Sequence, residues 1–345
     1  MKAIQITEHG NSEVLKVSNI NEPRCVDSKI KVRIKSSSVN HLDIWVRNGL
    51  KGLPIKLPLI LGSDGAGTIV EIGKNINKFN IGDDVVIQPG TFNIECKEVL
   101  NGKENYSSSY GILGETENGV QAEYVNLNIE NLYPKAAHLS FEEASSMQLV
   151  FMTSYQMLIK RANLKKEEYV LIYGATSGIG SAAIQIAKDI GAKIISTVGS
   201  KDKIRYAEDM GSDYVLIHNN DNNQFIKNVK EITNNNGCNV VFEHIGKSTW
   251  NQSLKILSRG GRLVTCGSTT GALVNIDLRH LFMKQQSILG STMASIETFE
   301  IVMKKINEKK YKPFVDEIFT FDEIKNAHKY IENRYNKGKV ILIPK

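Results

Sequence analysis

Residues 169–191, YVLIYGATSGIGSAAIQIAKDIG, decide the fold of this chain. They begin with the apolar run 169–173, which predicts a buried strand. From Ser181 the apolar residues recur every three or four positions, which predicts a helix that ends at Gly191. In the loop between them, 174–180, all residues but one are small. Such a loop lets a diphosphate approach the main chain at the helix start, where unpaired N–H groups and the positive end of the helix dipole lie.

Strand and helix patterns alternate from this stretch to residue 289. Further strands are predicted at 193–197, 214–217, 240–243, 262–266 and 287–289, and helices at 201–210, 224–233 and 250–257. This alternation predicts an α/β fold with a doubly wound, parallel, six-stranded sheet of the Rossmann type. A glycine-rich turn alone is weak evidence for a ligand, but after the first strand of such a sheet it predicts a dinucleotide site.

The composition narrows the class of protein. With 345 residues, 41% of them hydrophobic and 23% charged, the chain is expected to form a globular protein of two domains. The formal charge is +6, but the lysines are scattered, so we expect no nucleic-acid partner. Four separated cysteines without a CxxC pair fit a reducing cytoplasm. Since no apolar run is long enough for a membrane and no leader pattern begins the chain, we expect a cytoplasmic protein.

Residues 1–128 lack the alternation and predict a β-rich domain. Short strands are expected at 2–6, 30–34 and 68–72. Within 30–35, apolar residues alternate with three basic ones, which predicts a strand with one solvated face. Near the other end, 322–333 predicts a helix capped by Asp322, and 340–343 predicts a strand that returns to the first domain.

Five short motifs follow one another along the chain. They are VNHLDIWVR at 39–47, LGSDGAG at 61–67, GDDV at 82–85, the loop 174–180, and GKV at 338–340. In this order and together, they make the chain resemble the medium-chain dehydrogenase/reductase superfamily. Within it, the chain is most similar to the quinone oxidoreductase branch and its alcohol dehydrogenase-like relatives.

The resemblance implies the domain organisation. A GroES-like, β-rich catalytic domain would comprise residues 1–128 and 291–345, and a Rossmann dinucleotide-binding domain would comprise 129–290. It also implies a homodimer or homotetramer, because relatives usually continue their Rossmann sheets across a two-fold axis, which here would lie near 287–291.

The resemblance also allows the metal sites to be compared position by position. Zinc-dependent members hold a catalytic ion where this chain has Asn40, Ser63 and Leu149. An amide, a hydroxyl and an aliphatic side chain are poor ligands beside thiolate and imidazole, so we expect no catalytic zinc. At the four cysteine positions of the structural zinc lobe, the chain has Asn93, Cys96, Val99 and Ser107. One thiolate cannot close a tetrahedral site, so we expect a metal-free lobe.

Four residues are candidates for the reaction. The resemblance implies that Asn40 polarises a substrate oxygen, that Trp45 forms an aromatic wall, and that Thr153 packs beside the nicotinamide ring. Asp64 is the fourth, with orientation of its loop as the simpler role. Trp45 could instead be a core residue, and the Thr153 hydroxyl could bond only its own backbone. The neighbouring His41 and Asp43 are interpreted as hydrogen-bonding residues rather than as a catalytic pair.

The end of the second strand of the Rossmann sheet predicts the choice of dinucleotide. NAD-preferring enzymes carry a carboxylate there, and this chain has Val198. Hydroxyl and ammonium groups suited to a 2′-phosphate follow, at Ser200, Lys201 and Lys203. His218 stands where related reductases have a tyrosine near that phosphate. NADPH is therefore preferred to NADH.

The remaining candidates for the cofactor site come from the loop 174–180 and from strand ends at the carboxyl edge of the sheet. The full predicted set is Thr153, Ala175, Thr176, Ser177, Gly178, Ile179, Gly180, Ser200, Lys201, Lys203, His218, Ile245, Gly267, Ser268 and Leu289.

Together these observations predict a zinc-independent oxidoreductase that transfers a hydride from NADPH to a quinone or an α,β-unsaturated carbonyl compound. Its partner would be a small-molecule substrate. Three alternatives stay open: an enoyl reductase acting on acryloyl- or crotonyl-CoA, a zinc-type alcohol dehydrogenase with improvised ligands, and a cofactor-binding protein without turnover.

Overall fold

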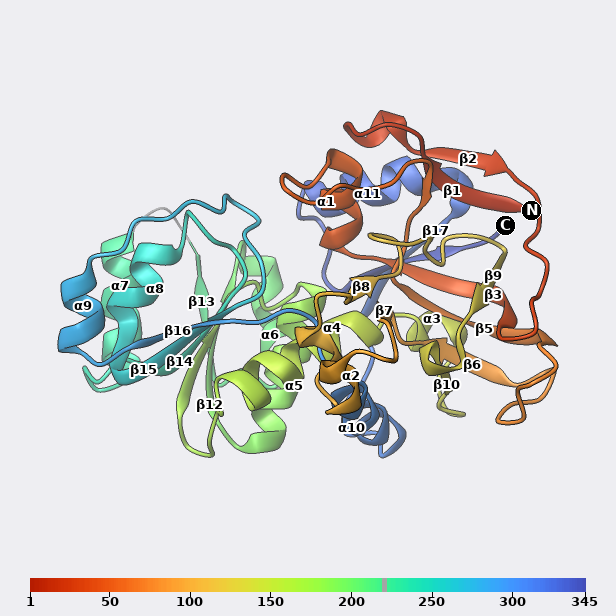
Figure 1. Cartoon of the computed structure of the whole chain (residues 1–345). Coiled ribbons are helices and arrows are strands. Elements are labelled where there is room, and N and C mark those ends of the chain that lie inside the picture. Colours follow the sequence, from red (N-terminus) through yellow and green to blue (C-terminus); the bar gives the residue numbers. More distant parts are fainter. Residues whose placement is uncertain (219–221) are drawn as a thin grey trace. The chain divides into compact units, whose positions relative to one another are not determined.

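The computed structural model describes residues 1–218 and 222–345, which form two compact units (Figure 1). Unit 1 comprises Met1–Leu149 and Ser295–Lys345, and unit 2 comprises Val150–Ala294. Both ends of the chain therefore belong to unit 1, and unit 2 is inserted between them. Among the described residues, no helix combines the length and the apolar character that crossing a membrane requires.

Unit 2 is built on a six-stranded sheet in the order β13-β12-β11-β14-β15-β16, with every neighbouring pair parallel. Its strands are β11 (Tyr169–Ile172), β12 (Lys193–Val198), β13 (Tyr214–Ile217), β14 (Cys238–Glu243), β15 (Leu257–Thr265) and β16 (Ser287–Gly290). Most residues at the centres of β11, β12 and β14 are buried, and most of them are apolar, as expected for a sheet that helices cover on both faces. The predicted Rossmann sheet is confirmed.

Helices precede or connect these strands. They are α4 (Gln148–Tyr155), which continues as the π-helical segment Gln156–Arg161, α5 (Gly178–Ile190), α6 (Ile204–Asp209), α7 (Asn222–Ile232), α8 (Trp250–Ile256) and α9 (Leu278–Met283). Helices α5 and α6 lie on one face, and α7 and α8 pack against each other on the opposite face (Figure 1). The carboxyl ends of the strands are thus left for ligands.

Unit 1 is a β-rich unit with a seven-stranded sheet. The main path runs β10-β6-β5-β3-β18-β17, with β9 also paired to β3. The strands are β3 (Ile30–Val39), β5 (Asp64–Ile72), β6 (Asp84–Ile87), β9 (Tyr124–Leu127), β10 (Leu132–Pro134), β17 (Val315–Thr320) and β18 (Lys339–Ile343). Smaller sheets are formed by β2 (Lys16–Asn19), β1 (Lys2–Ile6) and β4 (Leu59–Ile60), and by β7 (Gly90–Thr91) and β8 (Gly111–Ile112).

The helices of unit 1 are short, except near the C-terminus. They are α1 (His41–Asn48), α2 (Lys97–Leu100), α3 (Phe141–Ala144), α10 (Ile296–Asn307) and α11 (Ile324–Glu332). Two apolar clusters fill the unit, one between β3, β5 and β9 and one under α1 and α11. This arrangement agrees with the predicted GroES-like catalytic domain.

The last strand, β18, joins the C-terminal segment to the first half of unit 1. It lies between β3 and β17, with Val340 opposite Val39 in an antiparallel register. Because β3 ends at Val39 and β18 starts at Lys339, this register brings Lys339 beside Asn40. Two residues 299 positions apart in sequence thus meet at the carboxyl end of β3.

Segment 129–149 is grouped with unit 1, whereas the sequence assigned it to the nucleotide-binding domain. Strand β10 in this segment pairs with β6, and α3 packs on β3 and β5. This grouping results from backbone pairing with the β-rich sheet, which no local sequence pattern predicts.

Two local predictions are wrong. Lys31, on the face of β3 predicted to be solvated, is buried, and its ammonium pairs with Glu22 at 2.9 Å and with Glu71 at 2.5 Å. Asp322 does not cap the C-terminal helix α11: it lies in the 3-10 turn Phe321–Glu323 that precedes this helix. Thr320 caps that turn, and its backbone N–H donates to the Glu323 carboxylate at 2.9 Å. A reciprocal capping box there replaces the single cap that the sequence suggested.

Candidate active site

The start of α1 is tied to the loop before β5 by Asp43. One carboxylate oxygen of Asp43 accepts the Asn40 backbone N–H at 2.8 Å, and the other accepts the Gly62 N–H at 3.2 Å. Burial raises the pKa of Asp43 to about 7, and the charge of nearby Asp64 adds to this against the lowering effect of the hydrogen bonds and of Lys339. Asp43 therefore fixes the backbone on which Asn40 is presented.

Asp64 collects hydrogen bonds from four donors. Its Oδ1 accepts the Leu149 backbone N–H at 2.8 Å. Its Oδ2 accepts the Asn40 amide at 2.9 Å, the Lys339 ammonium at 3.1 Å and the Ser38 hydroxyl at 3.2 Å. The Asp64 side chain is fully buried, so these donors replace the water that a carboxylate otherwise needs.

Lys339 completes this cluster and fixes the Asn40 amide. Its Nζ donates to the Asn40 Oδ1 at 2.6 Å, while the Asn40 Nδ2 donates to Asp64. A lysine can only donate and a carboxylate can only accept, so the two ends of the amide cannot exchange places. We call Asn40, Asp64 and Lys339 the polar cluster of unit 1. The sequence predicted Asn40 and Asp64 and missed Lys339, although it noted the Gly-Lys-Val motif.

In unit 2, the loop after β11 has the geometry of an anion site. The Ser177 hydroxyl accepts the Gly180 N–H at 3.0 Å and caps α5, so the helix begins at Gly178, three residues earlier than predicted. A Cβ at Gly180 would collide with the Gly174 carbonyl oxygen. The first turn of α5 is thus pressed against the glycine loop, and a helix start of this kind offers its remaining N–H groups to an anion.

The end of β12 lies next to this loop. Val198 is buried, and a Cβ added at Gly199 would meet no described heavy atom within 4 Å, which leaves open space beside the backbone. The Ser200 hydroxyl donates to the Asp202 carboxylate at 2.6 Å. The short 3-10 turn that follows runs from Lys201, which is exposed, to Lys203, which is half-buried.

His218 at the end of β13 belongs to an aromatic and polar cluster. Its ring packs edge-on against Tyr173 at 5.9 Å and Phe225 at 5.8 Å between centroids. Its Nε2 lies 2.9 Å from the Gln252 side-chain nitrogen, which donates to it. The imidazole is thereby placed at the carboxyl edge of the sheet.

The ends of β14 and β15 are organised by Glu243, which the sequence did not single out. Its buried carboxylate accepts the N–H groups of Ile245 at 2.7 Å and Gly246 at 3.1 Å, and the Thr249 hydroxyl at 2.9 Å. The neighbouring His244 donates from Nε2 to the Tyr173 carbonyl at 2.9 Å, and burial lowers the pKa of this histidine. Glu243 thus shapes the loop in which Ile245 lies.

The other predicted cofactor residues also lie in unit 2. Gly267 and Ser268 follow β15, Leu289 is half-buried in β16, and Thr153 is buried in α4 with its hydroxyl 3.8 Å from the Met293 sulfur. Trp45 lies in unit 1, half-buried on α1, with its ring 6.2 Å from that of His41.

Known proteins with matching sequences and folds identify the family. Residues 26–137 match the alcohol dehydrogenase GroES-like domain, and residues 178–308 match the zinc-binding dehydrogenase family. A solved NAD-dependent alcohol dehydrogenase is 36% identical, with complete coverage of both chains and a TM-score of 0.95. The chain belongs to the medium-chain dehydrogenase/reductase superfamily. It is an NAD(P)H-dependent oxidoreductase of the quinone oxidoreductase-like branch.

Two relatives of similar identity carry different names. The quinone oxidoreductase of Salmonella typhimurium is 28% identical over 99% of each chain. The crotonyl-CoA carboxylase/reductase of Cereibacter sphaeroides is 28% identical over 99% of this chain and 86% of that protein. The resemblance predicted from the sequence is confirmed at the level of superfamily and branch.

The donor set of this medium-chain dehydrogenase/reductase does not fit a catalytic zinc ion. At the three expected ligand positions, the Asn40 amide is bonded to Asp64 and Lys339, the Ser63 hydroxyl donates to the Leu113 carbonyl at 2.8 Å, and Leu149 offers no side-chain ligand. Within residues 1–218 and 222–345, no three His, Cys, Asp or Glu side chains are grouped as metal ligands would be. An ammonium next to Asn40 also disfavours a second cation.

Hydroxyl groups occupy the lobe that carries structural zinc in other members of the superfamily. The Ser109 Oγ accepts the Asn93 backbone N–H at 3.1 Å and lies 2.9 Å from the Ser107 Oγ and 3.3 Å from the Cys96 Sγ. Three of the four cysteine positions therefore converge on one serine. Ser109 thus holds the lobe together by hydrogen bonds and not through a metal ion. The sequence analysis did not single out this residue.

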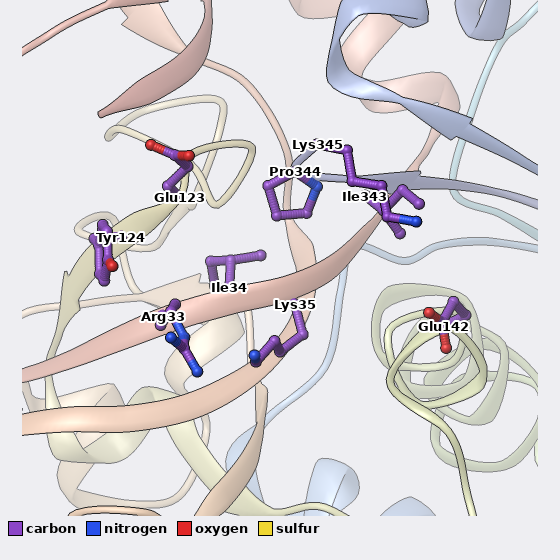
Figure 2. Close-up of a pocket in the computed structure, with 9 residues that line it drawn as sticks. All are labelled: Arg33, Ile34, Lys35, Glu123, Tyr124, Glu142, Ile343, Pro344 and Lys345. Atoms are coloured by element: carbon purple, nitrogen blue, oxygen red, sulfur yellow. The ribbon is translucent and has the colours of Figure 1, made fainter.

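A separate hollow lies on the surface of unit 1 (Figure 2). Its lining residues are Arg33, Ile34, Lys35, Glu123, Tyr124, Glu142, Ile343, Pro344 and Lys345. Charges of both signs face it, and none of the predicted site residues contributes to it. It is therefore not assigned to the active site.

Proposed function

We propose that this protein reduces a conjugated carbonyl compound or a quinone with NADPH, and that no zinc takes part. The observation that supports the reaction type is the polar cluster, in which ordinary hydrogen-bonding groups stand where zinc-dependent relatives hold their ion. Hydride transfer to such an acceptor develops negative charge on oxygen, which amide and ammonium donors can stabilise.

Unit 2 has the features that a nicotinamide dinucleotide requires. The start of α5 offers N–H groups to a diphosphate, and the contact between Gly180 and Gly174 keeps side chains out of its way. Bound NADPH would supply the hydride. The residues of the chain would bind it at the carboxyl edge of the sheet, with Ala175 to Gly180 at the diphosphate and Ile245, Gly267, Ser268 and Leu289 on the nicotinamide side.

The preference for NADPH is supported by the end of β12. Val198 carries no charge that would repel a 2′-phosphate, and the space beside Gly199 leaves room for one. Ser200, Lys201 and Lys203 would bind it, with His218 nearby. The Asp202 carboxylate would repel a phosphate, and it accepts the single Ser200 hydroxyl proton at 2.6 Å, so Ser200 must turn away from Asp202 to bind the 2′-phosphate.

Replacing Lys203 with glutamate should reverse this preference. We expect kcat/KM with NADPH to fall by about tenfold or more, equal to about 1.4 kcal/mol, and kcat/KM with NADH to change less than about twofold. Lys230→Glu, the same charge change on the exposed side of α7, should leave both values unchanged. Equal losses with both dinucleotides would show that Lys203 does not bind the 2′-phosphate.

The substrate class can be tested with a panel of small acceptors. Initial rates of NADPH and NADH oxidation should be compared for a cyclic enone, a benzoquinone, crotonyl-CoA and a primary aldehyde. We expect turnover of the enone or the quinone with NADPH. Preference for crotonyl-CoA would support the enoyl reductase alternative. The similarity of this chain to a crotonyl-CoA carboxylase/reductase favours that alternative. Tight NADPH binding without turnover of any acceptor would contradict the proposed reaction.

We also propose that two copies associate through the edge of the unit 2 sheet. Strand β16 pairs only with β15 among the described strands, and large apolar side chains are exposed in the preceding segment. Leu273 is 89% exposed, and Leu278, Phe282 and Met283 are each more than 60% exposed. A second copy with the same edge would cover them.

Sedimentation of the wild-type protein should show a dimer or a tetramer. Phe282→Glu should shift the sedimenting species towards the monomer. A wild-type protein that sediments as a monomer would refute the proposed association.

A further inference from the structure

The hollow on unit 1 lies where one edge of β3 has a gap between two neighbouring strands (Figure 2). On this edge, β9 pairs with β3 as far as Arg33, and β18 pairs with it from Ser37 to Val39. Pro344, which follows β18, has no N–H group and cannot extend the ladder across the gap. The opposite edge of β3 is paired with β5. The hollow is therefore a product of the strand order in this sheet.

A β-bulge lies at Lys35, within this gap. Ile34 pairs with Gly67 of β5 and Ser36 pairs with Ala66, so Lys35 has no partner on β5. A bulge of this kind changes the direction of a side chain. Lys35 lines the hollow together with Arg33, and both side chains leave β3 on the same side of the strand (Figure 2). Two cations thus face one hollow.

The chain supplies no counter-charge to these two cations. Lys31, the preceding basic residue of β3, pairs with Glu22 and with Glu71. In the part of the chain that the structure describes, the Arg33 guanidinium and the Lys35 ammonium have neither a carboxylate at ion-pair distance nor a hydrogen-bond acceptor. Lys35 is also half-buried, so its ammonium has lost part of its contact with water. An anion that enters the hollow would therefore meet two unpaired cations.

A carboxylate faces the same hollow and is also unpaired. Glu142 lies in the first turn of α3 and is half-buried. Its backbone carbonyl accepts the Ser145 hydroxyl at 3.1 Å, but its carboxylate has no partner within residues 1–218 and 222–345. The carboxylate is therefore beyond ion-pair distance from Arg33 and Lys35. Opposite charges that face one hollow without reaching each other leave room for a molecule between them.

The other lining residues define the kind of molecule that fits. Glu123 is less suited to a ligand, because its Oε2 already accepts the Lys2 backbone N–H at 2.7 Å. Half-buried Tyr124, Ile343 and Pro344 add apolar surface. The volume of the hollow is about 320 Å³, which is at the lower end of the range for small-molecule sites. These features favour a short aliphatic compound with a charge at each end.

We propose that this hollow binds a small zwitterion, with its carboxylate held by Arg33 and Lys35 and its ammonium group held by Glu142. Guanidinium and ammonium groups donate charge-assisted hydrogen bonds to a carboxylate, and Glu142 accepts them from an ammonium group. The ligand class is an ω-amino acid, whose aliphatic chain would pack against Ile343 and Pro344. The inference concerns a site outside the proposed reaction and does not depend on that reaction.

Isothermal titration calorimetry of the full chain with 4-aminobutyrate and 6-aminohexanoate tests the proposal. We expect at least one of them to bind with a dissociation constant below about 10 mM. Butyrate and hexanoate lack the ammonium group, and 1-aminobutane and 1-aminohexane lack the carboxylate. Each should bind at least about tenfold more weakly than the amino acid of the same length, equal to about 1.4 kcal/mol.

Substitutions in the hollow test whether both charges are used. Lys35→Gln and Glu142→Gln should each weaken binding of the amino acid by about tenfold or more, and Arg33→Gln is a second test of the cationic side. In Glu142→Gln, the amino acid and its analogue without the ammonium group should bind equally, because the ammonium has lost its acceptor. Lys16→Gln and Glu8→Gln make the same changes at exposed positions of unit 1 outside the hollow and should bind as the wild type does.

Three results would overturn the inference. The first is failure of both amino acids to bind. The second is binding that Lys35→Gln and Glu142→Gln leave unchanged, which would place the ligand elsewhere. The third is equal affinity of the wild type for the amino acid and for its analogue without the ammonium group, which would indicate an anion site alone. Since the titration needs neither dinucleotide nor turnover, its result is independent of the proposed function.

Discussion

Asp64→Ala should lower the free energy of unfolding by about 3–5 kcal/mol, more than any other single change in the polar cluster. The substitution leaves the buried Lys339 ammonium without its counter-charge and leaves three further donors without an acceptor. Urea unfolding of the wild type and the variant measures this difference.

Asp322→Ala is the matched control for this substitution. Asp322 also pairs with a lysine of unit 1, Lys2 at 3.2 Å, but its side chain is 61% exposed. Its loss should cost less than about 1 kcal/mol. The double variant Asp64→Ala/Lys339→Met should lose less than the sum of its single changes, because it carries no unpaired charge. If Asp64→Ala costs no more than Asp322→Ala, the cluster is not the tight network described here.

Gly180→Ala should give the largest loss of dinucleotide binding. The added Cβ would meet the Gly174 carbonyl oxygen, so the start of α5 must move away from the loop that it presses against. Overpacking of this kind costs about 1–3 kcal/mol. If the displaced N–H groups lose the diphosphate, the NADPH dissociation constant should rise by roughly tenfold to 100-fold. Fluorescence of bound NADPH measures it.

Gly290→Ala is the control for Gly180→Ala, because a Cβ at Gly290 would meet no described heavy atom within 4 Å. This variant adds the same methyl group to unit 2 and should bind NADPH as the wild type does. Unchanged binding by Gly180→Ala would mean that the loop 174–180 does not hold the diphosphate.

The alternation of apolar periods was sufficient to predict the Rossmann sheet. Strand β13 has the bounds that its sequence predicts, and β11 and β12 agree within a residue, because short β-branched runs between helices leave few choices. The start of α5 was placed too late, since the helix begins with two glycines and an isoleucine that carry no amphipathic pattern. The Ser177 cap, a signal that the sequence does contain, would have placed it correctly.

The sequence predicted only those residues of the polar cluster that lie in short local motifs. Asn40 and Asp64 lie in short motifs and meet as neighbours, whereas Lys339 joins them through the pairing of β18 with β3. Long-range pairing of this kind is not encoded in any local pattern. Lys31 was misjudged for a similar reason: its partners Glu22 and Glu71 come from other segments and allow a charged side chain to be buried on the expected wet face.

Glu243 and Ser109 illustrate a second limit. Each collects hydrogen bonds from neighbouring segments, Glu243 at the end of β14 and Ser109 in the lobe that keeps one of the four cysteines, Cys96. A lone glutamate after an apolar strand and a serine within a run of serines look ordinary in sequence. Their importance comes from burial and from the number of donors that converge on them.

The central claim is that reduction proceeds on donors of the chain rather than on a metal ion. The most direct test is the rate of NADPH oxidation with the best enone or quinone after exhaustive dialysis of the protein against a chelator. The account predicts a rate equal to that of the undialysed protein and unaffected by added zinc. A rate that disappears on dialysis and returns with one equivalent of zinc would contradict it.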